Sequence, residues 1–262
     1  MTDRDTPEPH LPATPAWPPR SAPRLFVSGP LDDGAQVNID GPQAHYLARV
    51  MRVGVGDAVI LCDDVTGEWA ARAVAVGKRD LTLECVTRLR AREDVPDFTL
   101  CAALLKKDRF DLVLEKACEL GVRRIQPVLT RRCVADKLNL ERARATLIEA
   151  AEQCARTALP DIAEPVKLDA LLKGWTVGQV APRTLFFADE MGGAPAAASF
   201  AAQTGPAALL TGPEGGFTDE ERSAIRAHGA ARPITLGPRI LRGETACIAA
   251  TALWMGICGD WL

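Results

Sequence analysis

Hydrophobic and polar residues alternate over short runs in the first third of the chain, a pattern typical of half-buried β-strands. Turn-forming residues separate these runs, and residues 42–51 have the spacing of a short helix instead. Several short strands at this spacing predict a small β-barrel. The expected strands are residues 25–27, 36–39, 58–62, 68–74 and 81–86.

Beyond residue 97 apolar runs alternate with amphipathic stretches. Apolar residues from Phe110 to Leu120 recur at helical spacing, and Gly121 is placed to end that helix. Thr218 and Glu221 have the spacing of a capping box, which starts another helix. This alternation predicts an α/β domain with a buried parallel sheet. The expected strands are 98–105, 125–129, 184–188, 207–211 and 234–236, and the expected helices are 110–120, 141–157, 218–229 and one from about 244.

These patterns divide the chain into three segments. Residues 1–23 contain seven prolines and no apolar periodicity, so we expect a disordered tail. Residues 24–93 form the barrel domain, and residues 97–262 form the α/β domain. The charged, proline-containing stretch at 91–97 is the expected linker.

Composition narrows the class of protein. The net charge is −3 over 262 residues, so any contact with nucleic acid has to use local basic patches. No apolar run reaches ~18 residues, which argues against a membrane span. Eight dispersed cysteines without a CxxC pair, together with three histidines, exclude the usual zinc spacings. We therefore expect a cytoplasmic protein that holds no metal and no disulfides.

Two glycine-containing loops carry the strongest chemical signal. The first, residues 209–217, contains Gly212, Gly215 and Gly216, which allow a ligand to approach the backbone closely. The second spans residues 236–246. Neither contains the GxxxxGK[ST] spacing of a phosphate-binding loop, and Glu214 would repel a phosphate. The expected ligand is uncharged or cationic here; taken alone, the first loop could also be a plain strand-to-helix turn.

Both loops, in this order near the chain end, resemble the signature of the SPOUT class of S-adenosylmethionine-dependent RNA methyltransferases. The similarity is closer to the RsmE family, which methylates N3 of a uridine in 16S ribosomal RNA. It extends over about residues 24–260, through the motifs at 45–53, 116–122, 130–133 and 149–156. Gly243 departs from the family's usual Thr, and Arg131 stands where an acidic residue is common.

The resemblance implies a PUA-like barrel, a C-terminal trefoil knot and a homodimer formed through the knot region. The apolar final helix, with Ile248, Leu253 and Trp254 in range of one face, agrees with a dimer. S-adenosylmethionine would lie between the two loops. Its expected contacts are Leu210, Gly212, Pro213, Glu214, Gly215, Gly216, Leu236, Gly237, Ile240, Leu241, Arg242 and Ala246.

Basic charge is concentrated where an RNA could bind. Residues 72–92 and 104–132 each carry a net charge of +4, although ordinary solvated faces would look similar. Few aromatic residues are available for stacking, so we expect recognition of RNA shape with one base extruded. The expected partner is 16S ribosomal RNA in the assembled 30S subunit, near the decoding centre. The expected RNA contacts are Arg49, Arg52, Lys106, Lys107, Arg132 and Arg156.

Methylation of uracil N3 requires loss of the N3 proton, and the catalytic candidates follow from that. Arg24 matches the early Arg of the family that this chain resembles, and the resemblance implies that Arg24 and Arg242 lie near the target base and stabilise its negative charge. Glu244, and also Glu119 or Glu214, could accept the proton directly or through water. An Arg242–Glu244 ion pair and a purely structural Glu119 are the alternatives. A SPOUT enzyme acting on ribose 2′-hydroxyls or transfer RNA, and a non-catalytic RNA-binding protein, are the alternative functions.

Overall fold

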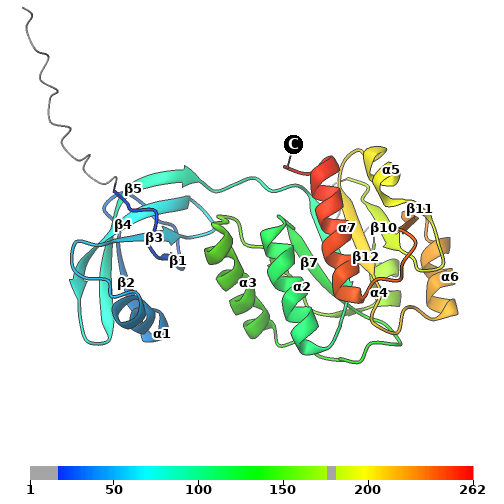
Figure 1. The fold of residues 1–262 in the computed structure, drawn as a ribbon, viewed down its shortest axis with the longest axis horizontal. Helices are drawn as coiled ribbons and strands as arrows, with labels where there is room; N and C mark the ends of the chain where they lie inside the picture. Colours follow the sequence, from blue (N-terminus) through cyan, green and yellow to red (C-terminus); the bar gives the residue numbers. More distant parts are fainter. Residues whose placement is uncertain (1–16, 176–180, 262) are drawn as a thin grey trace, which may run out of the picture. The chain divides into compact units, whose positions relative to one another are not determined.

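The computed structural model describes residues 17–175 and 181–261, so most of the predicted tail lies outside the described residues. The chain divides into two compact units between Ala91 and Arg92 (Figure 1). We call residues 1–91 unit 1 and residues 92–262 unit 2. No helix in the described part of the chain is both long and apolar enough to cross a membrane.

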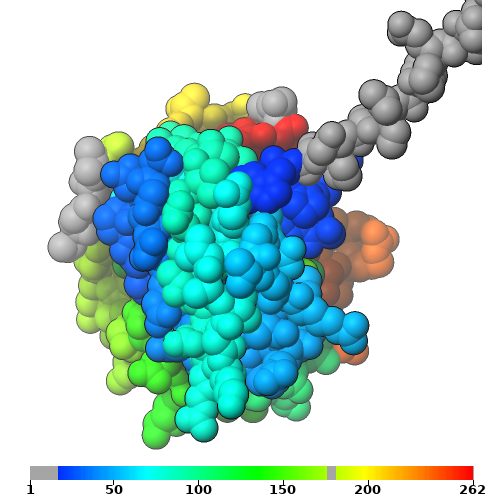
Figure 2. Space-filling view, turned by 90° about the vertical axis from the view of Figure 1, so that its left-hand side faces the viewer, coloured from blue at the N-terminus to red at the C-terminus, as the bar shows by residue number. Residues whose placement is uncertain are grey.

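Unit 1 is a mixed five-stranded sheet with the strand order β1-β3-β4-β5-β2. Figure 2 shows one face of this unit, with β5 between β2 and β4. Only β1 and β3 pair in parallel, and β1 and β2 stand at opposite ends of the sheet, so the barrel is an open half-barrel. The strands are β1 (Arg24–Phe26), β2 (Gln36–Asp40), β3 (Ala58–Cys62), β4 (Gly67–Val76) and β5 (Asp80–Ala91).

The helix predicted at 42–51 consists of two parts, α1 (Gly41–His45) and the π-helical turn η1 (Tyr46–Val50). The N–H of Met51 donates to the carbonyl of Tyr46, five residues earlier, which is the hydrogen bond of a π-helix. This segment covers the core of unit 1 with Ala44 and Leu47, which are 2% and 0% exposed.

Asp63 organises the turn between β3 and β4. Its buried carboxylate accepts hydrogen bonds from the backbone N–H groups of Leu31 (2.7 Å), Val65 (2.9 Å), Thr66 (2.7 Å) and Gly67 (3.1 Å). The Thr66 hydroxyl donates a fifth at 2.6 Å. Burial raises the pKa of Asp63, but these hydrogen bonds outweigh it and lower the pKa to about 2. The carboxylate therefore ties the chain before β2 to the β3–β4 turn.

Asp63→Asn should destabilise the protein by about 2 kcal/mol at pH 7, because one acceptor oxygen and the charge are lost. The pKa of Asp63 is lower in the folded than in the unfolded state, so its contribution is complete above about pH 4 and disappears as the pH falls toward 2. Urea unfolding of both proteins from pH 7 to pH 2 measures this, with the exposed Asp33→Asn as control. A stability difference that stays constant down to pH 2 would contradict it.

Unit 2 contains an eight-stranded parallel sheet with the order β11-β13-β10-β12-β6-β7-β8, in which β9 also pairs with β7. Every residue of β6 and β12 is buried, which confirms the predicted buried parallel sheet. The strands are β6 (Phe98–Ala103), β7 (Arg124–Leu129), β8 (Asp161–Ile162), β9 (Val166–Lys167), β10 (Thr184–Ala188), β11 (Ala194–Pro195), β12 (Ala207–Thr211) and β13 (Ala231–Thr235).

In the described part of unit 2, helices α2 to α7 pack around this sheet (Figure 1). The capping box of α6 is confirmed, since Thr218 and Glu221 exchange both hydrogen bonds. On α7, Trp254 stacks on Phe98 of β6 with ring centroids 4.3 Å apart. The trefoil knot stays a prediction. The helices are α2 (Lys107–Glu119), α3 (Leu140–Cys154), α4 (Leu168–Lys173), α5 (Ala196–Ala201), α6 (Asp219–Ala227) and α7 (Gly243–Cys258).

Candidate functional site

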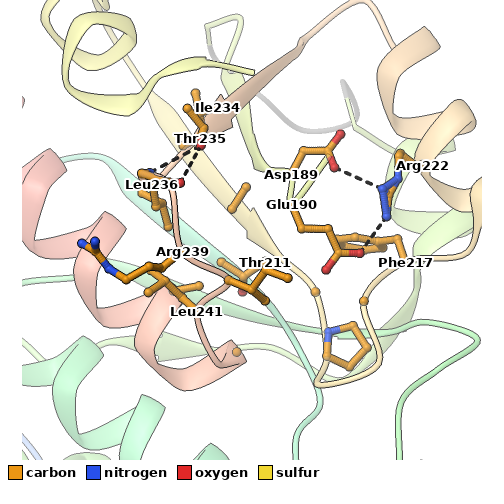
Figure 3. A pocket seen from close by; sticks show the side chains of 18 of the residues that line it. Asp189, Glu190, Thr211, Phe217, Arg222, Ile234, Thr235, Leu236, Arg239 and Leu241 are labelled. Carbon is orange, nitrogen blue, oxygen red and sulfur yellow. Dashed lines mark hydrogen bonds and ion pairs between the residues drawn. The ribbon is translucent and has the colours of Figure 1, made fainter. Parts of the chain in front are cut away.

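A pocket lies at the edge of the sheet where β10, β12 and β13 end (Figure 3). These three strands are neighbours and parallel, so their carboxyl ends meet at one edge. Residues 188–190, 211–213, 216–217 and 234–241 line the pocket, together with Arg222 of α6 and the first turn of α7. The two glycine loops of the sequence therefore form opposite parts of one pocket.

The first loop owes its shape to glycines. Gly216 has φ +66°, and its N–H donates to the carbonyl of Pro213 at 2.9 Å. A Cβ on Gly212 would lie 2.9 Å from the Phe217 ring, and one on Gly216 would lie 2.7 Å from Oε1 of Glu190. Gly212 therefore needs a residue without a side chain because the Phe217 ring lies against its backbone, and Gly216 needs one because of its positive φ.

The second loop turns sharply at Gly237, which has φ +110°. The Thr235 hydroxyl accepts from the Gly237 N–H at 3.4 Å and donates to its carbonyl at 3.3 Å. Ile240 lines the pocket and is 85% exposed, which is unusual for a large apolar residue. The loop therefore offers apolar surface to a ligand.

A third wall comes from the loop after β10, which the sequence analysis did not assign to the site. The Asp189 side chain is 1% exposed and accepts from Arg222 Nη1 at 3.2 Å and from Arg226 Nη2 at 2.6 Å. Glu190 Oε1 accepts from Arg222 Nη2 at 2.9 Å, and its side chain is 41% exposed (Figure 3). These two acids and two arginines sum to zero charge. The signal was available, because two acidic residues directly follow the predicted strand 184–188.

Eight of the twelve predicted cofactor contacts line the pocket: Gly212, Pro213, Gly216, Leu236, Gly237, Ile240, Leu241 and Ala246. The other four are not among the lining residues. Leu210 is fully buried within β12, and Arg242 is the exposed N-cap residue of α7. Glu214 Oε1 accepts from the backbone N–H of Lys106 at 3.4 Å, and the Gly215 carbonyl accepts from Arg132 at 2.9 Å.

Glu244 lies directly beside the pocket, but its ion pair is not the one considered from the sequence. Glu244 is 7% exposed and pairs with Arg109 of α2, whereas Arg242 has no ion pair in the described part of the chain. Oε2 of Glu244 is buried without a hydrogen-bond partner among the described residues. The Arg242–Glu244 ion pair considered as an alternative is therefore not formed, and one carboxylate oxygen has no partner among the described residues.

Glu119 lies near the C-terminal end of α2, away from the pocket lining. It pairs with Lys116 at 2.6 Å, and this hydrogen bond raises the pKa of Lys116. In unit 1, Arg24 pairs with the buried Glu68, which also pairs with Arg90. Burial raises the pKa of Glu68, but Arg90 and Arg24 outweigh it and lower the pKa.

Five of the six predicted RNA contacts are exposed: Arg49, Arg52, Lys106, Lys107 and Arg132. The prediction for Arg156 is wrong. Arg156 is 5% exposed, and its guanidinium donates to the carbonyls of Cys118 and Val122, both at 2.7 Å. It follows Ala155, which ends α3 in the left-handed region at φ 61°, so the chain turns its side chain inward.

The described residues contain no group of three or more His, Cys, Asp or Glu side chains that could hold a metal ion.

Comparison with known proteins identifies relatives of both units. Residues 92–255 match the model of the RNA methyltransferase domain family, and residues 39–85 match that of the RNA methyltransferase PUA domain. Ribosomal RNA small subunit methyltransferase E of Synechocystis is 36% identical over 87% of this chain and 76% of its own length. The Rickettsia conorii protein of the same name is 28% identical over 87% of this chain and 93% of its own.

Solved structures of methyltransferases are also similar to this chain. The crystal structure of ribosomal RNA small subunit methyltransferase E from Neisseria gonorrhoeae, bound to S-adenosyl methionine, has a TM-score of 0.81 and 27% identity. The alignment covers 92% of this chain and 100% of that one. The methyltransferase Lpg2936 from Legionella pneumophila, in complex with the same cofactor, has a TM-score of 0.79 at 28% identity, over 91% and 99% of the two chains.

Proposed function

Because the chain belongs to the ribosomal RNA small subunit methyltransferase E family, we propose that it transfers the methyl group of S-adenosylmethionine to N3 of a uridine in 16S ribosomal RNA. The observation that carries this proposal is the pocket. Two glycine loops at the carboxyl ends of β12 and β13 form it, in a fold whose relatives were crystallised with this cofactor.

The pocket fits the cofactor in shape and chemistry. Gly212 and Gly216 line the pocket with backbone alone, which lets a ligand approach closely, and Ile240 supplies apolar surface for a flat ring. Glu190 uses one oxygen for Arg222, which leaves the other as an acceptor within a neutral cluster. A neutral cluster favours a neutral donor over a cation, so the ribose hydroxyls of the cofactor are the proposed partners of Glu190.

The cofactor would supply the methyl group. The uracil must lose its N3 proton before or during its attack on the sulfonium methyl group. Of the three candidate acids, Glu244 is preferred, since its neighbours Gly243 and Ala246 line the pocket and its Oε2 lacks a partner among the described residues. Glu244 would accept the proton directly or through a water molecule. Arg24 and Arg242 are proposed to stabilise the negative charge that develops on the base.

The proposed substrate is 16S ribosomal RNA in the assembled 30S subunit, which implies a cytoplasmic protein. The exposed Lys106, Lys107 and Arg132 lie at the start of α2 and beside the first loop, so phosphate contacts there would hold RNA near the pocket. An enzyme that methylates ribose 2′-hydroxyls or transfer RNA is the alternative.

Glu190→Gln should weaken binding of S-adenosylmethionine about 10-fold, because a charged acceptor is worth ~1.5 kcal/mol or more. If Glu190 contacts the ribose, the substitution should weaken binding of S-adenosylhomocysteine by the same factor, since both molecules carry the same ribose. Calorimetric titration measures both, and Glu220→Gln on the exposed face of α6 is the matched control. Unchanged affinity, or a loss confined to the sulfonium compound, would contradict the assignment.

The protein should be incubated with labelled S-adenosylmethionine and with 30S subunits from a strain that lacks the enzyme. Digestion of the RNA to nucleosides should then yield labelled 3-methyluridine. Arg24→Ala and Arg242→Ala should each lower the rate about 100-fold, as expected when a charge-stabilising group is removed. Arg144→Ala, an exposed position on α3, is the control and should keep the wild-type rate. Label in 2′-O-methyl nucleosides or in transfer RNA would favour the alternative function.

A homodimer is proposed, since Ile248, Ala252 and Leu253 on α7 remain partly exposed. Light scattering at micromolar concentration should give about twice the chain mass of 28.1 kDa. A mass of one chain under these conditions would exclude it.

A further inference from the structure

The start of α2 contacts both loops of the pocket. The backbone N–H of Lys106 donates to the carboxylate of Glu214 in the first loop at 3.4 Å. A Cβ on Gly243, where the second loop enters α7, would lie 2.9 Å from the side chain of Leu105. The first turn of α2 is therefore within reach of a substrate that lies beside the pocket.

Arg109 in this turn forms an ion pair with Glu244 of α7, and the two members differ in exposure. The side chain of Glu244 is 9% exposed, whereas that of Arg109 is 35% exposed. Nη1 of Arg109 donates to Oε1 of Glu244, which is its only partner among the described side chains, and Oε2 of Glu244 is buried without one. A guanidinium carries five N–H donors, so the pair offers a ligand unused donors next to an acceptor oxygen that has no donor.

This arrangement of donors and acceptor matches one edge of uracil. The base presents its N3–H group, a donor, between the carbonyl oxygens O2 and O4, which are acceptors. The carboxylate of Glu244 can accept from N3–H while the guanidinium of Arg109 donates to the carbonyl oxygen beside it. Cytosine has no hydrogen on N3, so the carboxylate would face a second acceptor, and a buried polar group left unpaired in this way is costly.

We propose that Arg109 is a further catalytic residue, which donates to the uracil carbonyl oxygen beside N3 and stabilises the negative charge that forms there. The inference rests on the proposed function and adds a residue to the same site. The N3 proton passes to Glu244, directly or through water, N3 bonds to the methyl carbon, and the electrons of the broken carbon–sulfur bond stay on sulfur. The carbonyl oxygens share the charge left on N3, so a cation bonded to the accepting carboxylate lies next to it.

Single-turnover methylation of saturating 30S subunits tests this role. Arg109→Ala should lower the rate about 100-fold, while the affinity for S-adenosylmethionine stays at the wild-type value because Arg109 does not line the pocket. Arg109→Lys keeps the charge but not the planar fork, and should be about 10-fold faster than Arg109→Ala. Arg142→Ala is the matched control: it removes another ion pair of α2, with Asp111, and should keep the wild-type rate.

Two further measurements separate catalysis from a structural role of Arg109. Guanidinium ion, added at a concentration too low to denature the protein, should restore part of the rate of Arg109→Ala and leave Arg142→Ala unchanged, because it fills the place of the missing side chain. The rate of Arg109→Ala should also rise more steeply than that of the wild type from about pH 7 to about pH 9, since hydroxide then removes the N3 proton without help from the protein.

The outcomes distinguish this inference from the proposed function. A wild-type protein that forms no 3-methyluridine overturns both. With an active wild type, an unchanged rate for Arg109→Ala overturns the role of Arg109 alone, and so does a lowered rate that guanidinium does not restore and whose pH profile matches that of the wild type. If Arg109→Ala melts early, Arg109→Lys replaces it: a lowered rate with wild-type affinity for the cofactor supports the role, and an unchanged rate overturns it.

Discussion

The parallel pairing of β10 with β12 and β13 is the constraint on which the site depends. Because all three strands run in one direction, the loops that follow them emerge at the same edge of the sheet. Complete burial of β12 holds this register, since a slip by one residue would disturb the packing on both faces. Segments separated by tens of residues in the sequence thereby become walls of one pocket.

The pocket also requires glycine at particular positions of its loops. Gly216 and Gly237 adopt positive φ, and Gly212 leaves space for the Phe217 ring. Gly243, which departs from the family's usual Thr, is explained in the same way. A Cβ there would lie 2.9 Å from Leu105 and 3.2 Å from the Gly212 carbonyl, so the start of α7 packs closely against the first loop.

Patterns along the chain were sufficient for the fold, the family and most of the pocket. The predicted strand 58–62 and the Thr218 capping box are found as expected, since both depend on local sequence. Two-residue strands such as β8 and the six-residue α4 were not predicted, because so few positions show no periodicity. Glu190 was missed because its role depends on which strand lies next to which.

Charged residues were the least predictable part, because a side chain's partner is set by tertiary structure. Arg156 and Arg132 are both arginines close to family motifs, yet one is buried against carbonyl groups and the other is exposed beside the first loop. Sequence shows the charge but not its burial.

Tertiary structure also sets the partners of the buried carboxylates. Glu244 and Glu68 are each paired with an arginine that remains partly exposed, at Arg109 and Arg24. Such pairs add little net stability over apolar residues of similar size, because desolvation offsets the attraction between the charges, whereas loss of one partner is costly. Their effect is to fix orientation. Two of the groups proposed to act on the base, Arg24 in unit 1 and Glu244 in unit 2, are thus held by ion pairs that restrict their position more than they stabilise the fold.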